Sequence, residues 1–187
     1  QRQSPRIHTA GCASGRGFSM ALETDLQPNA LRQAFGRFPS GIAALCAEVD
    51  GAPQGIVASS FTVGVSMDPP LVMFAVQNTS RTWPLLRTAV RIGVSILGTG
   101  HDGVCRQIAS RDGDRFAGLS LHEADTGALF LDEAALWLET SVENEVPAGD
   151  HAVVLLRVHG YSTHDGAHEP LVFHGSAFRN LAVPAFA

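Results

Sequence analysis

Hydrophobic and polar positions follow one another with the short spacing of β-strands along most of the chain. Residues 42–49 and 55–59 are apolar runs that flank Asp50-Gly51, and an Asp-Gly pair in this position is a strong signal for a β-hairpin. The same kind of pattern predicts further strands at residues 91–97, 135–146, 151–163 and 170–175.

The most apolar stretch of the chain is residues 57–76, VASSFTVGVSMDPPLVMFAV. A helix that crosses a membrane needs about 20 uninterrupted apolar residues. Hydroxyl residues and Asp68 interrupt this stretch, and Pro69-Pro70 would break a helix. We therefore predict two strands, 61–66 and 71–76, with a turn between them, and no contact with a membrane.

Helices are predicted at only three places. The first covers residues 30–38, with Asp25 or Asn29 as its cap. Its apolar face comprises Leu31, Ala34, Phe35 and Phe38. Two more candidates, 83–89 and 102–110, are too short to be stable without packing. Strands with occasional helices and no regular βαβ repeat predict a mainly β fold, a closed or split β-barrel with short helices at its rim.

Length and composition indicate one globular domain. The chain has 187 residues, of which 45% are hydrophobic, enough for a sizeable core. Residues 1–24 are polar and rich in Gly and Ser, and they lack the apolar core of a secretion signal. We predict a flexible N-terminal tail at 1–24 and the folded domain at 25–187.

Charge and cysteine content exclude some classes of protein. The formal net charge is −5 and there is no run of basic residues, so a nucleic-acid surface is not expected. Three widely spaced cysteines form neither a disulfide framework nor a CxxC metal motif. A reducing, cytoplasmic location is the expectation that follows.

Motifs for hydrolysis and for nucleotide cradles are missing from the sequence. It contains no GxSxG, no HExxH, no phosphate-binding loop with Lys and no GxGxxG after a strand. His164, His168 and His174 lie close together in the sequence, but the first two fall in a turn-like segment where their spacing does not place them on one helix face. We expect a solvated hairpin loop there and no metal site.

The segment QNTSRTWPLL, residues 77–86, has a more specific composition. Pro84 fits only the first turn of a helix, which favours Thr82 as the N-cap. Hydroxyl groups and Arg81 at a helix start are suited to binding a phosphate, although an ordinary capped helix with an exposed Arg has the same pattern. Ser59 and Ser60 could face the same cavity, or they could satisfy backbone groups at a strand bend.

Six segments, in this order and at these spacings, resemble the flavin reductase family, which has the FMN-binding split-barrel fold. They are FGRFPSG, VASSFTVGVSMDPPLV, SRTWPLL, RDGDRFAG, PAGDHAVVLLRV and PLVFHGSAF. The resemblance extends from Leu31 to Leu181. Members of this family are the small reductases of two-component flavin-dependent monooxygenases.

The resemblance implies a set of ligand contacts. In relatives, residues equivalent to Ala58, Ser59, Ser60 and Phe61 line the isoalloxazine ring of the flavin. The ribityl and phosphate groups correspond to Gln77, Asn78, Ser80 and Thr82, and Arg81 joins them as a cofactor-binding candidate from the chemistry of the helix start. Phe116 and Phe178 are candidate aromatic contacts, and Phe178 stands where relatives often have Tyr, as Ser95 stands where Asn is frequent.

His151, in the segment GDH, is the residue that the resemblance places near both the flavin and the nicotinamide. It is the candidate catalytic residue, and the alternative is a His bonded to Asp150 at the start of a strand. Such a site moves a hydride from the nicotinamide to the flavin without a protein nucleophile, so it must position two rings and exclude water.

We therefore expect an NAD(P)H-dependent flavin reductase that uses FMN or FAD with NADH or NADPH. It would form a homodimer and supply reduced flavin to a partner monooxygenase. Three alternatives remain: a split-barrel flavoprotein that passes electrons to a metal complex, a non-enzymatic flavin-binding protein, and a metal-dependent β-barrel that uses the histidines.

Overall fold

A computed structural model describes residues 22–24, 26–164 and 169–181, and the chain in these ranges is mainly β. The three helices are α1 (Pro28–Phe35), α2 (Trp83–Leu86) and α3 (Asp102–Ile108). The strands of the first half are β1 (Ser40–Gly41), β2 (Ala43–Val49), β3 (Ala52–Ala58), β4 (Thr62–Met67), β5 (Pro70–Gln77) and β6 (Ile92–Ile96). Those of the second half are β7 (Leu121–Glu123), β8 (Ala128–Leu131), β9 (Leu136–Ala148), β10 (His151–Thr163), β11 (Leu171–His174) and β12 (Ala177–Asn180).

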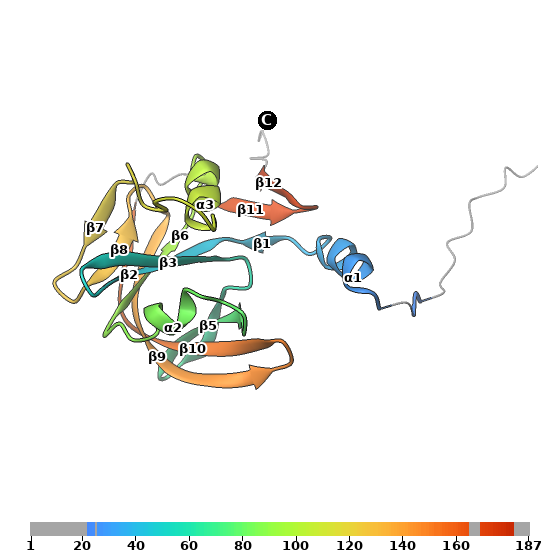
Figure 1. Cartoon of the computed structure of the whole chain (residues 1–187), viewed down its shortest axis with the longest axis horizontal. Helices are drawn as coiled ribbons and strands as arrows, with labels where there is room; N and C mark the ends of the chain where they lie inside the picture. The colour runs from blue at the N-terminus through green and yellow to red at the C-terminus, as the bar shows by residue number, and fades with distance from the viewer. Residues whose placement is uncertain (1–21, 25, 165–168, 182–187) are drawn as a thin grey trace, which may run out of the picture.

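The strands form a strongly curved antiparallel sheet with a small second sheet beside it. The large sheet has the order β4-β5-β10-β9-β6-β2-β8-β7, and β3 pairs with β2 outside this path. The second sheet has the order β1-β11-β12. In Figure 1, α2 lies between β3 and the long β9–β10 hairpin, while α3 lies beside β11 and β12. The predicted mainly β barrel with short helices at its rim is confirmed.

The β2–β3 hairpin forms where the sequence predicted it. Val49 pairs with Ala52, so the loop consists of Asp50 and Gly51 alone. Both residues have positive φ angles, 53° and 75°, as a tight two-residue hairpin turn requires. Glycine has no side chain to oppose this conformation, and Asp tolerates it better than most residues.

Two hydrophobic cores share strand β2 as a common wall. Side chains of a strand alternate between its two faces. Ala43, Leu45 and Ala47 accordingly belong to the first core, which contains Phe74, Trp83 and Val154 among others. Ala44 and Cys46 belong to the second core, between the sheet and α3, with Ile108, Phe116 and Leu129.

The first helix differs from its prediction in position and in packing. It begins at Pro28, which is the first residue of the helix, and Gln27 is the N-cap residue. Asn29 lies inside the helix, so its prediction as the cap is wrong, and Asp25 lies outside the described residues. Pro28 explains the shift, because proline is well suited to the first turn. No residue of α1 is buried, and Phe35 and Phe38 are 68% and 76% exposed.

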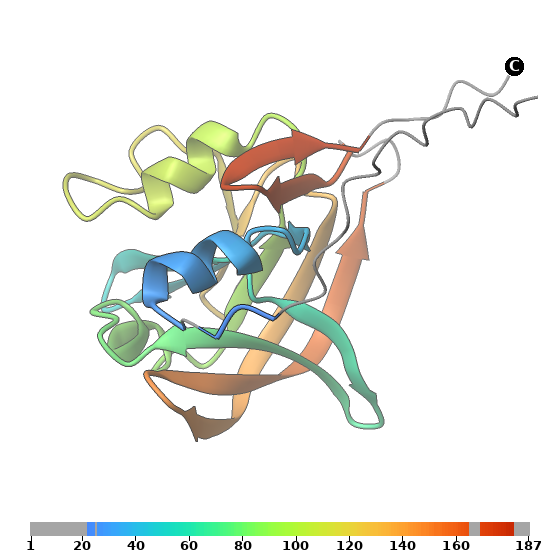
Figure 2. The same cartoon turned by 90° about the vertical axis from the view of Figure 1, so that its right-hand side faces the viewer.

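Figure 2 shows α1 on the outside of the barrel, below the β11–β12 hairpin. The helix is joined to this hairpin by a hydrogen bond from the Gly175 N–H to the Gly36 carbonyl oxygen, at 2.7 Å. Residues 22–24 of the predicted tail are exposed and have no regular structure, and the rest of it up to residue 21 lies outside the described residues. The apolar side of α1 is therefore open in this single chain.

Candidate functional site

A cleft of about 980 Å³ opens on one side of the barrel. It is lined by strand β3 with Ser59 and Ser60, the end of β5 with residues 79–82, Leu85 of α2, the end of α3 with residues 109–111, Arg115 and His151. Strands β3 and β5 are not neighbours in the sheet order, and the curvature of the barrel brings them together. The fold thus joins the two polar clusters that the sequence analysis placed at one cavity.

The cleft is positively charged although the chain is acidic. Arg81, Arg111 and Arg115 line it together with His151, and the described residues that line it include no Asp or Glu. The whole chain has a formal net charge of −5. Cations gathered in one cleft of an acidic protein raise the local concentration of an anionic ligand.

The Ser60 hydroxyl is hydrogen-bonded to the backbone of strand β5. Its hydroxyl donates to the Ala75 carbonyl oxygen and accepts from the Ala75 N–H, both at 3.0 Å. This pair of bonds fixes the chain where β3 ends. One interpretation of Ser59 and Ser60 was that their hydroxyls satisfy backbone groups at a strand bend, and Ser60 does so. Ala58 and Ser59 line the cleft beside it, and Ser59 is exposed.

Residues 80–82 form a turn in which each hydroxyl has a different role. The Ser80 hydroxyl accepts the Trp83 N–H at 3.1 Å and so caps α2. Thr82 is the N-cap residue, as predicted, but its side chain makes no capping hydrogen bond. Helix α2 has only four residues, and the side chains of Arg81, Thr82 and Arg115 lie beside its start in the wall of the cleft.

Arg115 is a site residue that the sequence analysis missed. Its Nη1 donates to the Thr82 hydroxyl at 3.2 Å, to the Gly55 carbonyl oxygen at 3.1 Å and to the Ile108 carbonyl oxygen at 3.4 Å. One guanidinium group therefore joins three walls of the cleft. The segment RDGDRFAG contained the signal, since the planar guanidinium group of an arginine matches the geometry of a phosphate.

Phe116, Phe61 and Asn78 are not among the residues that line the cleft, and their predicted ligand contacts stay predictions. The Phe116 N–H bonds to the Asp114 carboxylate at 2.9 Å, and its ring is buried in the second core. A Cβ atom at Gly55 would lie 2.7 Å from the Phe116 ring, so Phe116 supports the cleft wall from behind. Phe61 packs against the first core instead.

Asn78 instead holds the turn that precedes His151. Its side-chain amide donates to the Gly149 carbonyl oxygen at 3.2 Å, and its N–H donates to the Asp150 carbonyl oxygen at 3.0 Å. Gln77, the neighbouring residue, lines the cleft and pairs with His151 in the sheet. The end of β5 thus fixes the position at which β10 begins.

His151 is half-buried in the cleft wall and bonded to Asp150. Its Nδ1 lies 2.7 Å from the Asp150 carboxylate, so the predicted bond to Asp150 is present. His151 also lines the cleft. The hydrogen bond from His151 holds the pKa of Asp150 below its usual value. An ionised Asp150 accepts the Nδ1 hydrogen, which leaves Nε2 as the ring nitrogen available to a ligand.

The remaining candidates lie elsewhere. Ser95 is buried and accepts the Leu131 N–H at 2.9 Å, which is a structural role. Phe178 packs edge-on against Phe173, outside this cleft. His164 contacts the Trp137 ring edge-on, His174 ends β11, and His168 lies outside the described residues.

The described residues carry neither a candidate metal centre nor a candidate membrane-spanning helix. No three His, Cys, Asp or Glu side chains in this part of the chain are grouped so that they could hold a metal ion. Among the described helices, none has the length and apolar character needed to span a membrane.

Comparison with known proteins identifies the family. The family model described as a flavin reductase like domain matches residues 35–182. The chain is 34% identical over 135 residues to a flavin reductase of Pseudomonas putida, a match that covers 72% of this chain and 79% of the relative. It is 30% identical over 156 residues to the flavin-dependent monooxygenase reductase subunit HsaB of Rhodococcus jostii, covering 83% and 79%.

The fold of a solved relative agrees with this match. The NADH:FAD oxidoreductase SgcE6 of Streptomyces globisporus, in complex with NAD and FAD fragments, superposes with a TM-score of 0.81 at 29% identity. The superposition covers 89% of this chain and all of the other. The family resemblance found in the sequence is confirmed, and the chain belongs to the flavin reductase family.

Proposed function

We propose that this protein is an NAD(P)H:flavin oxidoreductase whose cleft binds FMN or FAD together with a nicotinamide nucleotide. The observation that carries the proposal is the cationic cleft itself, in which Arg81, Arg115 and His151 meet the bend at Ser59 and Ser60. When bound, the flavin supplies the acceptor for a hydride from the nicotinamide. Flavin and nicotinamide nucleotides are anionic, which suits a cleft lined by arginines without carboxylates.

We assign the flavin phosphate to the corner formed by Arg81, Thr82 and Arg115. The Thr82 hydroxyl accepts a hydrogen from Arg115, so its own hydrogen is available to a phosphate oxygen. Arg115 is held by two carbonyl groups as well, and a pre-positioned guanidinium loses little entropy on binding. The Ser80 hydroxyl accepts the Trp83 N–H and likewise keeps its own hydrogen, but it also caps α2, so its loss would affect the helix as well as a ligand.

The backbone of Ala58, Ser59 and Ser60 is the surface that we assign to the isoalloxazine ring. Ser60 is bonded twice to Ala75, so this surface is rigid. Rigid backbone dipoles along a ring stabilise negative charge that develops on it without reorganisation. His151, oriented by Asp150, has Nε2 free to position the nicotinamide.

The partner that we propose is a flavin-dependent monooxygenase. HsaB of Rhodococcus jostii is by name the reductase subunit of such an enzyme, and this chain covers 79% of its length. Reduced flavin made in the cleft would pass to that oxygenase. We further propose a cytoplasmic location, which agrees with the free, buried thiols of Cys46 and Cys105.

We propose a homodimer on the basis of the apolar surface around α1. Leu22, Leu26, Phe35 and Phe38 are all exposed in the single chain. The edge strand β4 adds exposed Val63 and Met67. Large apolar side chains exposed in this number are typical of an interface between subunits. Light scattering should give twice the chain mass for the parent and a monomer for Phe35→Asp/Phe38→Asp.

The function is tested by oxidation of NADH and NADPH in the presence of FMN, FAD or riboflavin. We expect nucleotide oxidation that depends on added flavin, followed by flavin bleaching in the absence of oxygen. Tight flavin binding without nucleotide oxidation would instead support the non-enzymatic alternative. Oxidation that requires a ferric or cobalt complex would support the electron-transfer alternative.

A further inference from the structure

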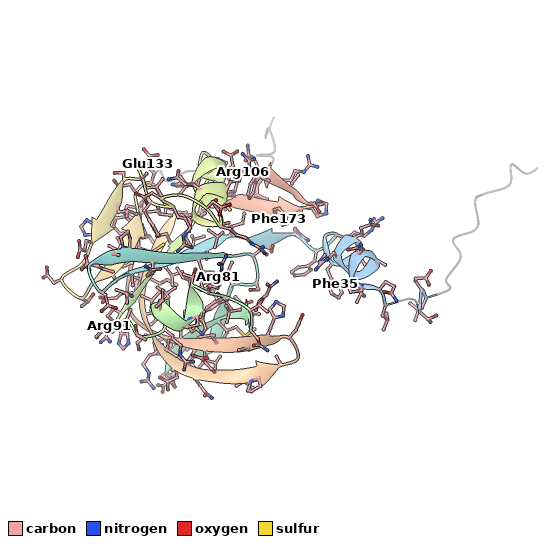
Figure 3. All side chains as sticks on the ribbon, in the orientation of Figure 1. Phe35, Arg81, Arg91, Arg106, Glu133 and Phe173 are labelled. Carbon is pink, nitrogen blue, oxygen red and sulfur yellow. The ribbon has the colours of Figure 1, made fainter. Side chains whose placement is uncertain are left out.

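Helix α2 connects the cationic cleft to the long β9–β10 hairpin. It begins directly after Thr82 of the cleft wall, and Figure 3 shows Arg81 next to α2, between β3 and this hairpin. The helix has only four residues, and so short a helix is not stable without tertiary packing. The contacts that α2 makes with the rest of the barrel therefore decide where Thr82 lies.

Apolar packing holds one side of α2. Trp83 and Leu86 are buried in the first core, and the Trp83 ring meets the Phe74 ring edge-on, with centroids 5.3 Å apart. The indole Nε1 of Trp83 is buried and has no hydrogen-bond partner among the described residues. Apolar packing is not directional, so the orientation of the helix depends on other contacts.

A polar contact holds each end of α2. At its start, the Thr82 hydroxyl accepts a hydrogen from Arg115, 3.2 Å away. At its other end, the C-cap residue Arg87 forms an ion pair with Glu145 of β9, with Nη2 and Oε1 3.2 Å apart. The two contacts join the helix to two different parts of the chain, the loop after α3 and the long hairpin.

Glu145 points to the core side of the sheet although it is acidic. It pairs with Val154 of β10, which pairs in turn with Phe74 of β5, and paired residues of neighbouring strands direct their side chains to the same face. Val154 and Phe74 both belong to the first core. The Glu145 side chain is 20% exposed, and its Oε1 is shielded from solvent. The carboxylate therefore faces α2 and Arg87.

A β-bulge in β9 explains the direction of Glu145. Val142, three residues earlier, pairs with Leu156 and packs against the first core. In a regular strand, residues three apart point to opposite faces. The register of β9 shifts between Leu155 and Leu156, so one extra residue turns Glu145 to the same face as Val142. The bulge thus brings a carboxylate to the end of α2.

We propose that Glu145 is a positioning residue for the flavin phosphate: through Arg87 it holds α2, and with the helix it holds the Thr82 hydroxyl in place. The inference rests on the proposed function, because it concerns the corner that we assign to that phosphate. Glu145 and Arg87 are not among the residues that line the cleft, so both act through the helix.

The ring surface of the cleft does not depend on this ion pair. Ser60 is bonded to Ala75 of β5, and β3 is paired with β2. Loss of the ion pair should therefore weaken binding of the phosphate and leave binding of the ring unchanged. FMN and riboflavin differ only in the phosphate, so the ratio of their affinities separates a positioning role from a general loss of stability.

Tryptophan fluorescence reports the position of α2 without a ligand. The chain contains two tryptophans, so Trp137→Phe leaves Trp83 as the single reporter. Trp83 is buried, so its emission should lie at short wavelength and be little quenched by acrylamide. Glu145→Gln in this background should shift the emission to longer wavelength and increase the quenching.

Titration with FMN and riboflavin measures the consequence for the site. Glu145→Gln should weaken FMN binding about threefold to fivefold, the effect of losing an ion pair of this kind, and leave riboflavin binding unchanged. Arg87→Gln should do the same, and the double variant should bind FMN as either single variant does, because both changes break one contact. Glu143→Gln is the matched control, since it breaks an ion pair of the same hairpin, with Arg157, that does not involve α2.

An unchanged ratio of FMN to riboflavin affinity in both single variants would refute the positioning role, as would additive losses in the double variant. A lower melting temperature with an unchanged ratio would make the ion pair a structural contact only. Failure of the proposed function is distinguishable, because a parent chain that binds neither flavin would refute that function. The fluorescence of Trp83 would then still decide whether Glu145 holds α2.

Discussion

Arg115 donates a hydrogen bond to the hydroxyl of Thr82 across 33 residues of sequence, with Nη1 and Oγ1 3.2 Å apart. This contact joins the loop after α3 to the turn before α2 at the corner that we assign to a phosphate. Ser80, two residues earlier, has its hydroxyl bonded to the Trp83 N–H. The two hydroxyl groups should therefore respond differently to mutation.

Thr82→Val should weaken FMN binding about tenfold, because a hydrogen bond to a charged group contributes about 1.5–3 kcal/mol. Riboflavin lacks the phosphate, so its affinity should change little. Ser80→Ala removes the cap of α2 and should lower stability by about 1 kcal/mol, an effect that is not expected for Thr82→Val. Fluorescence titration and thermal unfolding measure these effects. Equal losses for FMN and riboflavin in Thr82→Val would place the phosphate elsewhere.

His151→Ala should slow flavin reduction about tenfold, or raise the nicotinamide KM by a similar factor, which corresponds to about 1.4 kcal/mol. The residue is half-buried and its partner is an exposed Asp150, so the melting temperature should change little. Stopped-flow reduction beside thermal unfolding separates the two effects. Asp150→Asn is the companion variant, since it removes the charge that orients the imidazole. A destabilised variant that reduces flavin at the parent rate would make His151 a structural residue only.

Gly93→Ala should destabilise the fold strongly. A Cβ atom at this position would lie 2.2 Å from the Leu129 carbonyl oxygen, and a backbone atom cannot move aside as a flexible side chain can. The expected loss is about 3 kcal/mol or more, measured by urea unfolding. Gly160→Ala in β10 is the control, because no atom lies within 4 Å of its added Cβ. Similar stabilities of the two variants would contradict the close contact of β6 with β8.

The Glu143–Arg157 ion pair predicts a pH dependence of stability. The hydrogen bond from Arg157 holds the pKa of Glu143 below its usual value of 4.5. The folded protein therefore binds this proton less tightly than the unfolded chain, so the stabilisation is present above about pH 4.5 and is lost as the pH falls through the lowered pKa. The difference in unfolding free energy between parent and Glu143→Gln should accordingly shrink on acidification. A difference that stays constant from neutral pH to pH 3 would argue against the pair.

Cys46 should be unreactive in the folded protein. Burial raises the pKa of its thiol to about 12, and the side chain is enclosed by the second core. Only the thiolate is nucleophilic, so iodoacetamide at mildly alkaline pH should leave Cys46 unmodified until denaturant is added. Peptide mass mapping reports the modification at this residue. Rapid labelling without denaturant would mean that this core opens easily.

The sequence predicted the elements and the place of the site better than its individual contacts. The β2–β3 hairpin follows from Asp50-Gly51 alone, and Ser59, Ser80 and His151 meet in one cleft as expected. The short strands β1, β7, β8 and β12 were not predicted, because two to four residues are too few to show a period.

The candidate residues that lie outside the cleft lining share one physical feature. Which side a loop residue turns to depends on distant partners, and the sequence does not show them. The Phe116 ring packs in the second core with Cys46 and Leu129, and Asn78 bonds to Gly149, 71 residues further along. Arg115 was missed for the same reason, since its bonds to Gly55, Thr82 and Ile108 exist only in the folded chain.

The shared wall formed by β2 has a consequence for how the protein unfolds. Leu45 and Cys46 are neighbours in the chain, yet one is buried in the first core and the other in the second. Neither core can lose its packing without exposing the opposite face of the same strand, so partial melting of one core is penalised by the other. Calorimetry of the isolated chain should therefore give a single transition in which the van't Hoff and calorimetric enthalpies agree. The cleft, whose wall β3 is paired to β2, then persists up to the temperature at which the entire barrel melts.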